Sequence, residues 1–280
     1  MTDAEISDLE VHLFVEALYR RHGHDFRNYA RASLKRRILN LTTVFGCAHV
    51  TDLIPRLIHQ PGFIDQILPH ISVPVTEMFR DPEVFLALRQ HVLPVLASYP
   101  RINIWQAGCA TGEEVYSLAI LLKEEGLYDR TQIYATDFND VALAKAEEGV
   151  LPLRQIKDFS LNYLRSGGKG SLSDYYHAAY DRAALDRSLQ TNITFAHHNL
   201  VSDGVFCEVH MILCRNVLIY FDRLLQNRVL QLFRDSIVRQ GFLCLGNRES
   251  LQFSGVNNDF DAIDPEHRIF RKHLMAGDTP

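Results

Sequence analysis

The stretch "WQAGCATGEEVYSLA", residues 105–119, decides the fold because it joins a buried strand to a helix through a glycine turn. Such turns lie at the carboxyl ends of strands, where open α/β sheets bind their ligands. The turn lacks the second glycine of G-x-G-x-x-G, which lets a backbone approach a pyrophosphate. Glu113 and Glu114 open the helix, where they suit its dipole but repel a phosphate. The pattern therefore favours a ligand without phosphate.

The next strand of the same unit ends in Asp137, at a position from which an acid binds a ribose diol. S-adenosylmethionine fits these features, because it has a sulfonium, an ammonium group and a ribose but no phosphate. Each feature alone also has a structural explanation: a tight turn, two first-turn acids, and a cap for the helix expected over 140–149. Together, within one strand–helix–strand unit, they favour a nucleoside site.

The composition sets broad limits. The 280 residues are 47% hydrophobic and 22% charged, as in ordinary globular proteins, and the net charge of −5 argues against nucleic-acid binding. Five scattered cysteines without a C-x-x-C pair and 13 histidines without ligand spacing predict neither a disulfide scaffold nor a metal site. No apolar run is long enough to span a bilayer and no signal-peptide pattern is seen, so we expect a cytoplasmic protein.

From about residue 80 strands and helices alternate, which predicts a mostly parallel α/β sheet with helices on both faces. We expect strands at 102–108, 132–137, 192–199, 210–216, 241–247 and 268–274. We expect helices at 82–100, 113–126, 140–149 and 223–241. The alternation breaks between Glu147 and Asn192, where "RSGGKGS" (165–171) is typical of a flexible segment, so an insertion is predicted there.

The first 70 or so residues show helical spacing and no alternating β-branched runs. Helices are expected over 9–23, 27–46 and 49–60, the third capped by Thr51 or Asp52. In the first helix the apolar residues taken as its inner face are Leu9, Leu13, Phe14 and Leu18. We therefore predict a helical domain at 1–72 and a larger domain at 73–280, with the insertion at about 150–192.

Four motifs resemble those of the chemotaxis-receptor methyltransferase (CheR) family. "GCATGEEVYSLA" (108–119) is similar to the family's GCSTGEEPYSLA, and "ILCRNVLIYFD" (212–222) is similar to its IFCRNVLIYFD. "VTEMFRDPEVF" (75–85) resembles the T-x-FFR-[DE] segment, and "HHNL" (197–200) resembles a strand end of the form F-x-x-x-N-L. The order and spacing agree, and the resemblance covers about residues 8–273.

The resemblance implies a class I S-adenosylmethionine-dependent methyltransferase with a Rossmann-like sheet, a helical N-terminal domain and an inserted β-subdomain. Family members methylate glutamate side chains in the cytoplasmic signalling domain of methyl-accepting chemotaxis proteins and release S-adenosylhomocysteine. Some use the inserted subdomain to bind a tethering peptide at the receptor C-terminus.

Matched positions imply specific roles. Arg80 and Tyr220 correspond to the catalytic pair, with Glu114 at the methionine part of the cofactor and Asp137 at its ribose. The whole cofactor-binding set is Thr76, Arg80, Gly108, Glu114, Asp137, Asn199, Leu200, Arg215 and Asn216. From the residues alone, Arg80 could instead pair with Asp81 or Glu83, and Tyr220 could be a core aromatic.

Four positions depart from the family pattern. Pro74 removes a possible hydrogen bond to the cofactor, and Met78 stands where the first Phe of FFR is usual. Ala110 and Val115 are milder changes, from Ser and Pro. None of the four removes a residue that the chemistry requires.

A basic cluster lies in the second expected helix. Arg27, Arg31 and Lys35 recur every four residues, flanked by Arg36 and Arg37. A solvated helix face is one explanation. In the family this helix is basic, and the resemblance implies that Arg31, Lys35, Arg36 and Arg37 dock the acidic methylation helices of the receptor.

Three functions remain open on the sequence. The first is methyl transfer to receptor glutamates, and the second keeps the fold but methylates another protein or a small-molecule carboxylate. The third is a non-catalytic scaffold that binds S-adenosylmethionine. A nicotinamide-dependent dehydrogenase is disfavoured, because the glycines that a pyrophosphate needs are absent.

Overall fold

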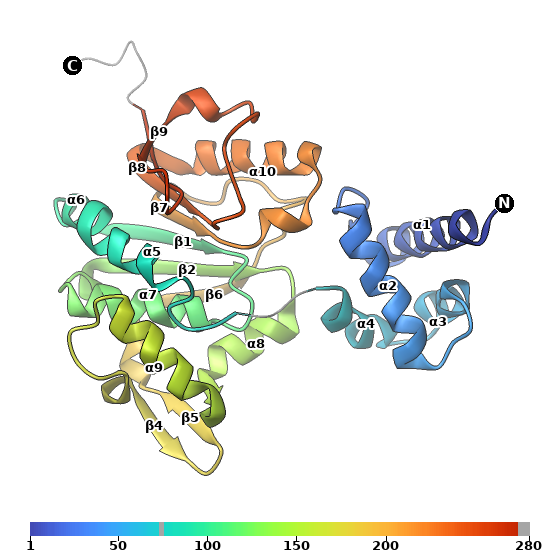
Figure 1. The fold of residues 1–280 in the computed structure, drawn as a ribbon, viewed down its shortest axis with the longest axis horizontal. Coiled ribbons are helices and arrows are strands. Elements are labelled where there is room, and N and C mark those ends of the chain that lie inside the picture. The colour runs from blue at the N-terminus through green and yellow to red at the C-terminus, as the bar shows by residue number, and fades with distance from the viewer. Residues whose placement is uncertain (73–75, 274–280) are drawn as a thin grey trace. The chain divides into compact units, whose positions relative to one another are not determined.

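The computed structural model describes residues 1–72 and 76–273, and the chain divides into two compact units (Figure 1). The helical unit consists of Met1–Val73 together with Leu218–Arg228, and the sheet unit consists of Pro74–Val217 and Val229–Pro280. Pro74, one of the departures from the family pattern, lies outside the described residues.

The helical unit contains α1 (Asp3–His22), α2 (Arg31–Phe45), the short turn η1 (Val50–Asp52), α3 (Leu53–His59) and α4 (Phe63–Ile71). Local chemistry sets the ends of α1 and α2. The side chain of Thr2 accepts the Glu5 N–H at the start of α1. Gly23 and Gly46 end the two helices with φ of 78° and 66°, values that favour glycine.

The buried face of α1 agrees only in part with the prediction, which holds for Phe14 and Leu18. Leu9 and Leu13 are 45% and 44% exposed, and the buried residues are Val11, Phe14, Val15 and Leu18. At 100° per residue the two leucines lie on the opposite side of the helix from the buried stripe. The spacing between two apolar residues therefore did not reveal which stripe faces the bundle.

Two further details of the bundle differ from the prediction. Helix α4 was not predicted, because Pro69 interrupts its apolar pattern. The carboxylate of Asp52 accepts the backbone N–H of His49 at 2.9 Å instead of capping α3 with its side chain.

The segment Leu218–Arg228 joins the helical unit through local contacts. The Ala30 N–H donates to the Tyr220 carbonyl at 2.8 Å, and the Asp222 N–H donates to the Asn28 carbonyl at 2.8 Å. The rings of Tyr29 and Phe221 meet edge to face with centroids 5.1 Å apart. The segment that carries most of the "CRNVLIYFD" motif therefore packs on the connection between α1 and α2, which the sequence order did not suggest.

The sheet unit is built on a seven-stranded sheet in the order β6-β2-β1-β7-β8-β10-β9. Its first five strands in this order run parallel, and β10 is antiparallel to both neighbours (Figure 1). The predicted mostly parallel sheet is confirmed. The strands are β1 (Ile102–Ala107), β2 (Thr131–Asp137), β6 (Ile193–His197), β7 (Val209–Cys214), β8 (Ile237–Leu245), β9 (Phe260–Asp264) and β10 (Ile269–Lys272).

Helices cover both faces of this sheet. Along β1, Trp105 packs on Phe233 of α10, while its neighbour Gln106 bonds to Glu114 of α7. Because successive strand residues point to opposite faces, α10 and α7 lie on opposite sides. The helices are α5 (Pro82–Ala87), a π-helical turn (Leu88–Val92), α6 (Leu93–Leu96), α7 (Glu113–Glu124), α8 (Asp140–Glu148) and α10 (Arg223–Ser236).

Two strand assignments needed the tertiary structure. Helix α10 ends at Ser236, so the last residues of the helix predicted over 223–241 belong to β8 instead. Strand β9 was not predicted, because its "FDAID" sequence has only a weak apolar alternation. The start of β8 pairs with β7, through Val209 and Ile237, and β9 pairs with β10, so both assignments depend on contacts between strands.

Residues of the predicted insertion form β3 (Val150–Pro152), α9 (Ile156–Arg165), β4 (Tyr176–Ala179) and β5 (Arg182–Leu185). The three strands make a separate antiparallel sheet in the order β3-β5-β4. Helix α9 was not predicted, and it packs against α5 of the main domain. Among the described residues no single helix is long and apolar enough to cross a membrane; the bent pair Arg31–Phe45 and Val50–His59 passes by length and composition alone.

The chain reverses its direction of growth across the sheet at β1. It proceeds from β1 to β2 and β6 on one side, then returns to β7 and β8 on the other. After β1 the chain therefore continues to one side of the sheet, and after β7 it continues to the other. Ligands bind at the carboxyl edge of such sheets, at the point where the strand order reverses. Gly108 has φ of 70°, and a Cβ there would lie 2.5 Å from Cγ2 of Val217. Only glycine lets the loops after β1 and β7 meet so closely.

Replacing Gly108 by alanine is therefore expected to destabilise the fold by about 2–4 kcal/mol, from left-handed backbone strain and overpacking. Urea denaturation measures this loss. The double variant Gly108→Ala/Val217→Ala should recover the part of the lost stability that comes from the clash with Val217. An unchanged urea midpoint for Gly108→Ala would contradict the requirement for glycine at this position.

Candidate functional site

Asp137 joins the first two loops of the carboxyl edge. Its Oδ2 accepts the Ala110 N–H from the glycine turn at 2.9 Å, and its Oδ1 accepts the Asn139 N–H at 2.9 Å. Burial raises the pKa of this carboxyl above its ordinary value, while these backbone donors act to lower it. Asn139, not Asp137, is the side-chain cap of α8, because it accepts the N–H groups of Val141 and Ala142.

Glu114, Arg215 and Asp81 form a buried ion-pair network at the centre of the edge. Arg215 donates from Nη1 to Glu114 Oε2 at 2.6 Å and from Nη2 to Asp81 Oδ2 at 2.6 Å. The Arg215 side chain is 0% exposed. Burial acts to lower the pKa of Arg215, yet the adjoining carboxylates, Glu114 first, raise it overall. Gln106 Nε2 donates to the other Glu114 oxygen at 2.9 Å.

The members of this network bond to one another, which the sequence did not predict. The Arg215 guanidinium also donates to the Arg80 carbonyl at 3.1 Å, while its Nε has no hydrogen-bond partner among the described residues. Each Glu114 oxygen keeps a second lone pair for a further donor. Glu114 and Arg215, both in the predicted cofactor-binding set, thus lie together, and the bond between them was not predicted.

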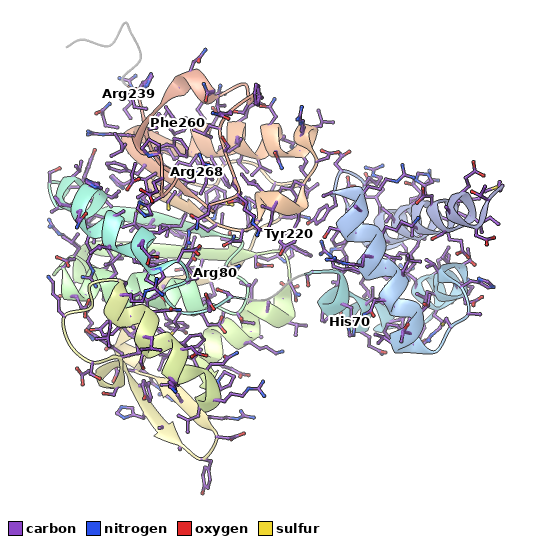
Figure 2. All side chains as sticks on the ribbon, viewed as in Figure 1. His70, Arg80, Tyr220, Arg239, Phe260 and Arg268 are labelled. Atoms are coloured by element: carbon purple, nitrogen blue, oxygen red, sulfur yellow. The ribbon has the colours of Figure 1, made fainter. Side chains whose placement is uncertain are left out.

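Arg80 lies in a turn just before α5 (Figure 2). Its neighbours Phe79 and Asp81 have φ of 51° and 52°, which is unfavourable for residues other than glycine. Neither sequence-based alternative for Arg80 holds, because Asp81 pairs with Arg215 and Glu83 pairs with Arg165 at 2.6 Å. Within residues 76–273 and 1–72 no ion pair involves the half-buried Arg80 side chain.

The remaining members of the predicted set lie in other segments of the sheet unit. Thr76 is half-buried at the start of the described chain of this unit. Met78 is fully buried, so its replacement of Phe is a packing change. Asn199 uses Oδ1 to accept the Val201 N–H at 3.0 Å, which shapes the loop after β6, and Leu200 is buried.

Asn216, after β7, has φ of 61° and donates its N–H to Glu249 Oε2 at 3.2 Å. The same oxygen accepts the Gly246 N–H at 2.6 Å, so Glu249 joins the loops after β7 and β8. Glu249, Gln106 and Asp81 were missed by the sequence. Glu249 shares a signal with Asp137, since Asp137 ends a strand and Glu249 follows one, and Gln106 is a polar residue inside a strand.

Two buried acceptor atoms at this edge have no hydrogen-bond partner among the described residues: Gln106 Oε1 and Asn216 Oδ1. Buried polar atoms are normally paired, so unpaired acceptors suit a ligand that brings donors, such as an ammonium group or ribose hydroxyls. Phosphate, which brings only acceptors and negative charge, fits this arrangement poorly. In the part of the chain that is described, no group of His, Cys, Asp or Glu residues is arranged to hold a metal ion.

The predicted docking residues of α2 do not form one free surface. Arg31 and Lys35 both pair with Asp8, at 3.5 Å and 2.7 Å. Arg37 donates to the Ile71 carbonyl and to Ser33, and its guanidinium lies 4.9 Å from the Tyr220 ring centroid. Arg36 is exposed.

Tyr220 therefore has a defined place within the helical unit. Its ring lies under the Arg37 guanidinium, and its carbonyl accepts the Ala30 N–H. Burial lowers the pKa of Arg37, the largest effect on that group. From the sequence alone, Arg37 could not be distinguished from the other three basic residues. The partners of Arg37 that distinguish it lie on α4 and just before α10.

Comparison with known proteins identifies the family of both parts of the chain. Residues 74–269 match the model of the CheR methyltransferase SAM-binding domain, and residues 9–72 match that of the CheR all-alpha domain. The fold and site thus define an S-adenosylmethionine-dependent methyltransferase of class I, with an all-helical N-terminal region. The chain belongs to the CheR methyltransferase family, and S-adenosylmethionine is its cofactor.

Several curated relatives have similar lengths. A protein of Pseudomonas putida that carries the name methyltransferase Cher3 is 48% identical over 97% of this chain and 100% of its own. A chemotaxis protein methyltransferase of Listeria monocytogenes is 28% identical, over 85% of this chain and 88% of its own. One of Vibrio parahaemolyticus is also 28% identical, over 94% and 96%. Among solved structures, the N-methyltransferase NodS of Bradyrhizobium japonicum is 14% identical with a TM-score of 0.34, over 60% of this chain and 62% of its own.

Glu113 gives a pH-dependent prediction. Burial raises the pKa of its carboxyl above the ordinary value, although the Thr111 hydroxyl donates to it at 2.7 Å. A raised folded-state pKa means that the associated stability is fully present below the unfolded pKa, about 4.3, and is lost as pH rises through the folded one. Glu113→Gln should therefore be more stable than the wild type at pH 7.5, and this difference should vanish below about pH 4.

Chemical denaturation at the two pH values, with cofactor affinity as the control, tests this expectation. Affinity should not change, because Glu113 is bonded to its own loop. A variant less stable at pH 7.5, or one that loses the cofactor, would show that Glu113 serves the ligand.

Proposed function

We propose that this protein transfers the methyl group of S-adenosylmethionine to glutamate side chains of methyl-accepting chemotaxis proteins. The observation that carries the proposal is the contrast between the two arginines of the site. Arg215 is buried and paired with two carboxylates, whereas among the described residues no ion pair involves Arg80. An uncommitted guanidinium beside a cofactor site is suited to orient an acceptor carboxylate.

Methyl transfer to a carboxylate requires mainly that the protein align the reacting atoms and exclude water from the pocket. A glutamate has a reference pKa of about 4.3, so it is ionised at pH 7 and needs no general base. S-adenosylmethionine supplies a methyl group on a sulfonium, which is electrophilic without further activation. Because a carboxylate and a cation neutralise each other as they react, water slows the step and a dry pocket favours it. Alignment of the reacting atoms can supply on the order of 7–11 kcal/mol.

Arg80 would orient the acceptor without clamping it, because a tight ion pair would stabilise the ground state. The turn that carries Arg80 limits the mobility of this side chain, because Arg215 donates a hydrogen bond to the backbone of the turn. Tyr220 is proposed to face the reaction centre. Its place under Arg37 gives the ring a fixed orientation in the helical unit.

The acceptor is proposed to be the acidic cytoplasmic signalling domain of a chemoreceptor. Several relatives are named chemotaxis protein methyltransferases, at about 28% identity. The basic residues of α2 support docking of an acidic helix. Of the four, Arg36 is the one that we propose as the main contact, since Arg31 and Lys35 share Asp8 and Arg37 holds α4.

Transfer of a labelled methyl group to purified receptor fragments tests the proposal. A base-labile ester on a glutamate is the expected product. Label on a different acceptor would support a changed substrate, and cofactor binding without label on any acceptor would support a non-catalytic scaffold.

Arg80→Ala and Tyr220→Phe should each retain cofactor affinity and lose methyl transfer, by about 100-fold for Arg80→Ala, the scale for loss of one positioned donor. Calorimetric titration with S-adenosylhomocysteine and a methyl-transfer assay give the two readouts. A normal methylation rate in either variant would refute the role proposed for that residue.

Arg36→Glu should weaken receptor binding and flatten its salt dependence while leaving the unfolding midpoint almost unchanged, because the side chain is exposed. Arg37→Glu is the matched contrast. It should unfold the helical unit, since it removes the donor to Ile71 and buries a carboxylate beside Tyr220. Salt-insensitive receptor binding by the wild type would remove Arg36 from the interface.

A further inference from the structure

The turn that carries Arg80 has an unfavourable backbone that its own sequence does not stabilise. Phe79 and Asp81, on either side of Arg80, both have positive φ. Each such residue costs about 1–3 kcal/mol and persists only where its surroundings enforce it. The contacts that enforce this conformation therefore decide where the Arg80 side chain points.

Three side chains from three different elements hold the turn by its backbone. Ser117 of α7 accepts the Phe79 N–H at 2.8 Å. Arg215, after β7, donates to the Arg80 carbonyl at 3.1 Å. The third is Asn162 of α9, whose Nδ2 donates to the Met78 carbonyl at 3.2 Å. Ser117 lies in the motif at 108–119 and Arg215 in the motif at 212–222, whereas Asn162 belongs to the insertion.

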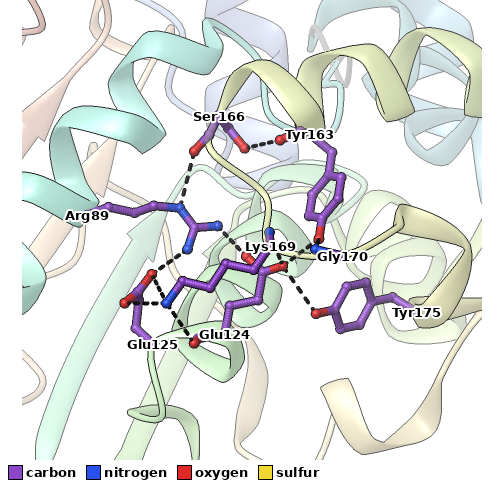
Figure 3. A network of polar contacts seen from close by, with 8 residues as sticks. All are labelled: Arg89, Glu124, Glu125, Tyr163, Ser166, Lys169, Gly170 and Tyr175. Carbon is purple, nitrogen blue, oxygen red and sulfur yellow. Dashed lines mark hydrogen bonds and ion pairs between the residues drawn. The ribbon is translucent and has the colours of Figure 1, made fainter.

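Helix α9 is itself fixed by a buried network (Figure 3). Tyr163, next to Asn162, places its ring 5.3 Å from that of Phe79 and donates its hydroxyl to Glu124. Glu124 is also paired with Arg89, and the side chains of both are under 10% exposed. Burial, followed by the Glu124 hydrogen bond, raises the pKa of Tyr163, which keeps the hydroxyl protonated as a donor.

The segment after α9 closes the same network. The Lys169 N–H donates to Glu124 Oε1 at 3.0 Å, and Lys169 Nζ reaches Glu125 Oε2 at 3.0 Å (Figure 3). Arg89 Nε donates to the Ser166 carbonyl at 3.1 Å. The glycine-rich stretch that the sequence predicted to be flexible is thus bonded to the end of α7, and α9 is held at its C-terminal end.

We propose that Asn162 is a positioning residue for methyl transfer, through which α9 of the insertion fixes the orientation of Arg80. This inference rests on the proposed function in one respect, because that function gives Arg80 the role of orienting the acceptor carboxylate. An amide is suited to the position, because it donates to a carbonyl without adding a charge. Leucine has a similar size and lacks the donor, so it removes the hydrogen bond with little change in packing.

The test is a double-mutant cycle on the full-length protein with a receptor fragment as acceptor. Asn162→Leu should lower kcat roughly tenfold, the scale of one hydrogen bond, with KM and Kd for the cofactor unchanged. In the Arg80→Ala background the same change should have no further effect, because Asn162 acts through Arg80. Leu161→Ala, at a neighbouring residue that is 53% exposed, is the matched control and should keep full activity.

Each outcome has a distinct meaning. If Arg80→Ala is fully active, the proposed function of Arg80 fails. If Arg80→Ala is impaired but Asn162→Leu lowers kcat by the same factor in both backgrounds, or leaves the wild-type kcat unchanged, the positioning role of Asn162 is wrong. Should Asn162→Leu fold poorly, by circular dichroism or a lowered melting temperature, Asn162→Ala provides the same cycle.

Discussion

The site depends on one buried cation, Arg215. Its guanidinium lies between the carboxylates of Glu114 and Asp81, and it also donates to the backbone of Arg80. Removing one partner of such a pair typically costs about 3–5 kcal/mol, because a charge stays buried without compensation. Three parts of the sheet unit, the start of α7, the loop after β7 and the turn before α5, are therefore held in one arrangement.

This arrangement leaves the site with two kinds of group. Charges that build the site are paired and buried, as Glu114 and Arg215 are. Groups that remain for a ligand are the unpaired acceptors of Gln106 and Asn216 and the uncommitted guanidinium of Arg80. The first kind provides rigidity, and we propose that the second provides recognition of a ligand rich in donors and of an acceptor with a carboxylate.

The two additions to the sheet unit differ in what they contribute. The insertion reaches the turn of Arg80 through α9, which is anchored by the buried pair of Arg89 and Glu124. The helical unit takes up Leu218–Arg228 and with it Tyr220. Residues of one continuous motif thus serve two compact units, since Arg215 belongs to the sheet unit and Tyr220 to the helical one.

The sequence by itself determined the elements around the glycine turn, the family and the cofactor. The elements follow from local patterns, because alternation sets the strands, glycine sets the turn, and Glu113 and Glu114 disfavour phosphate. The family and the cofactor follow from the resemblance of the four motifs. Only the tertiary structure decided which charges pair, because Arg215 and Asp81 are far apart in the chain and one-dimensional spacing carries no such information. For the same reason it alone decided that Leu9 and Leu13 face outward, that Arg37 is a structural residue, and that α9 supports Arg80.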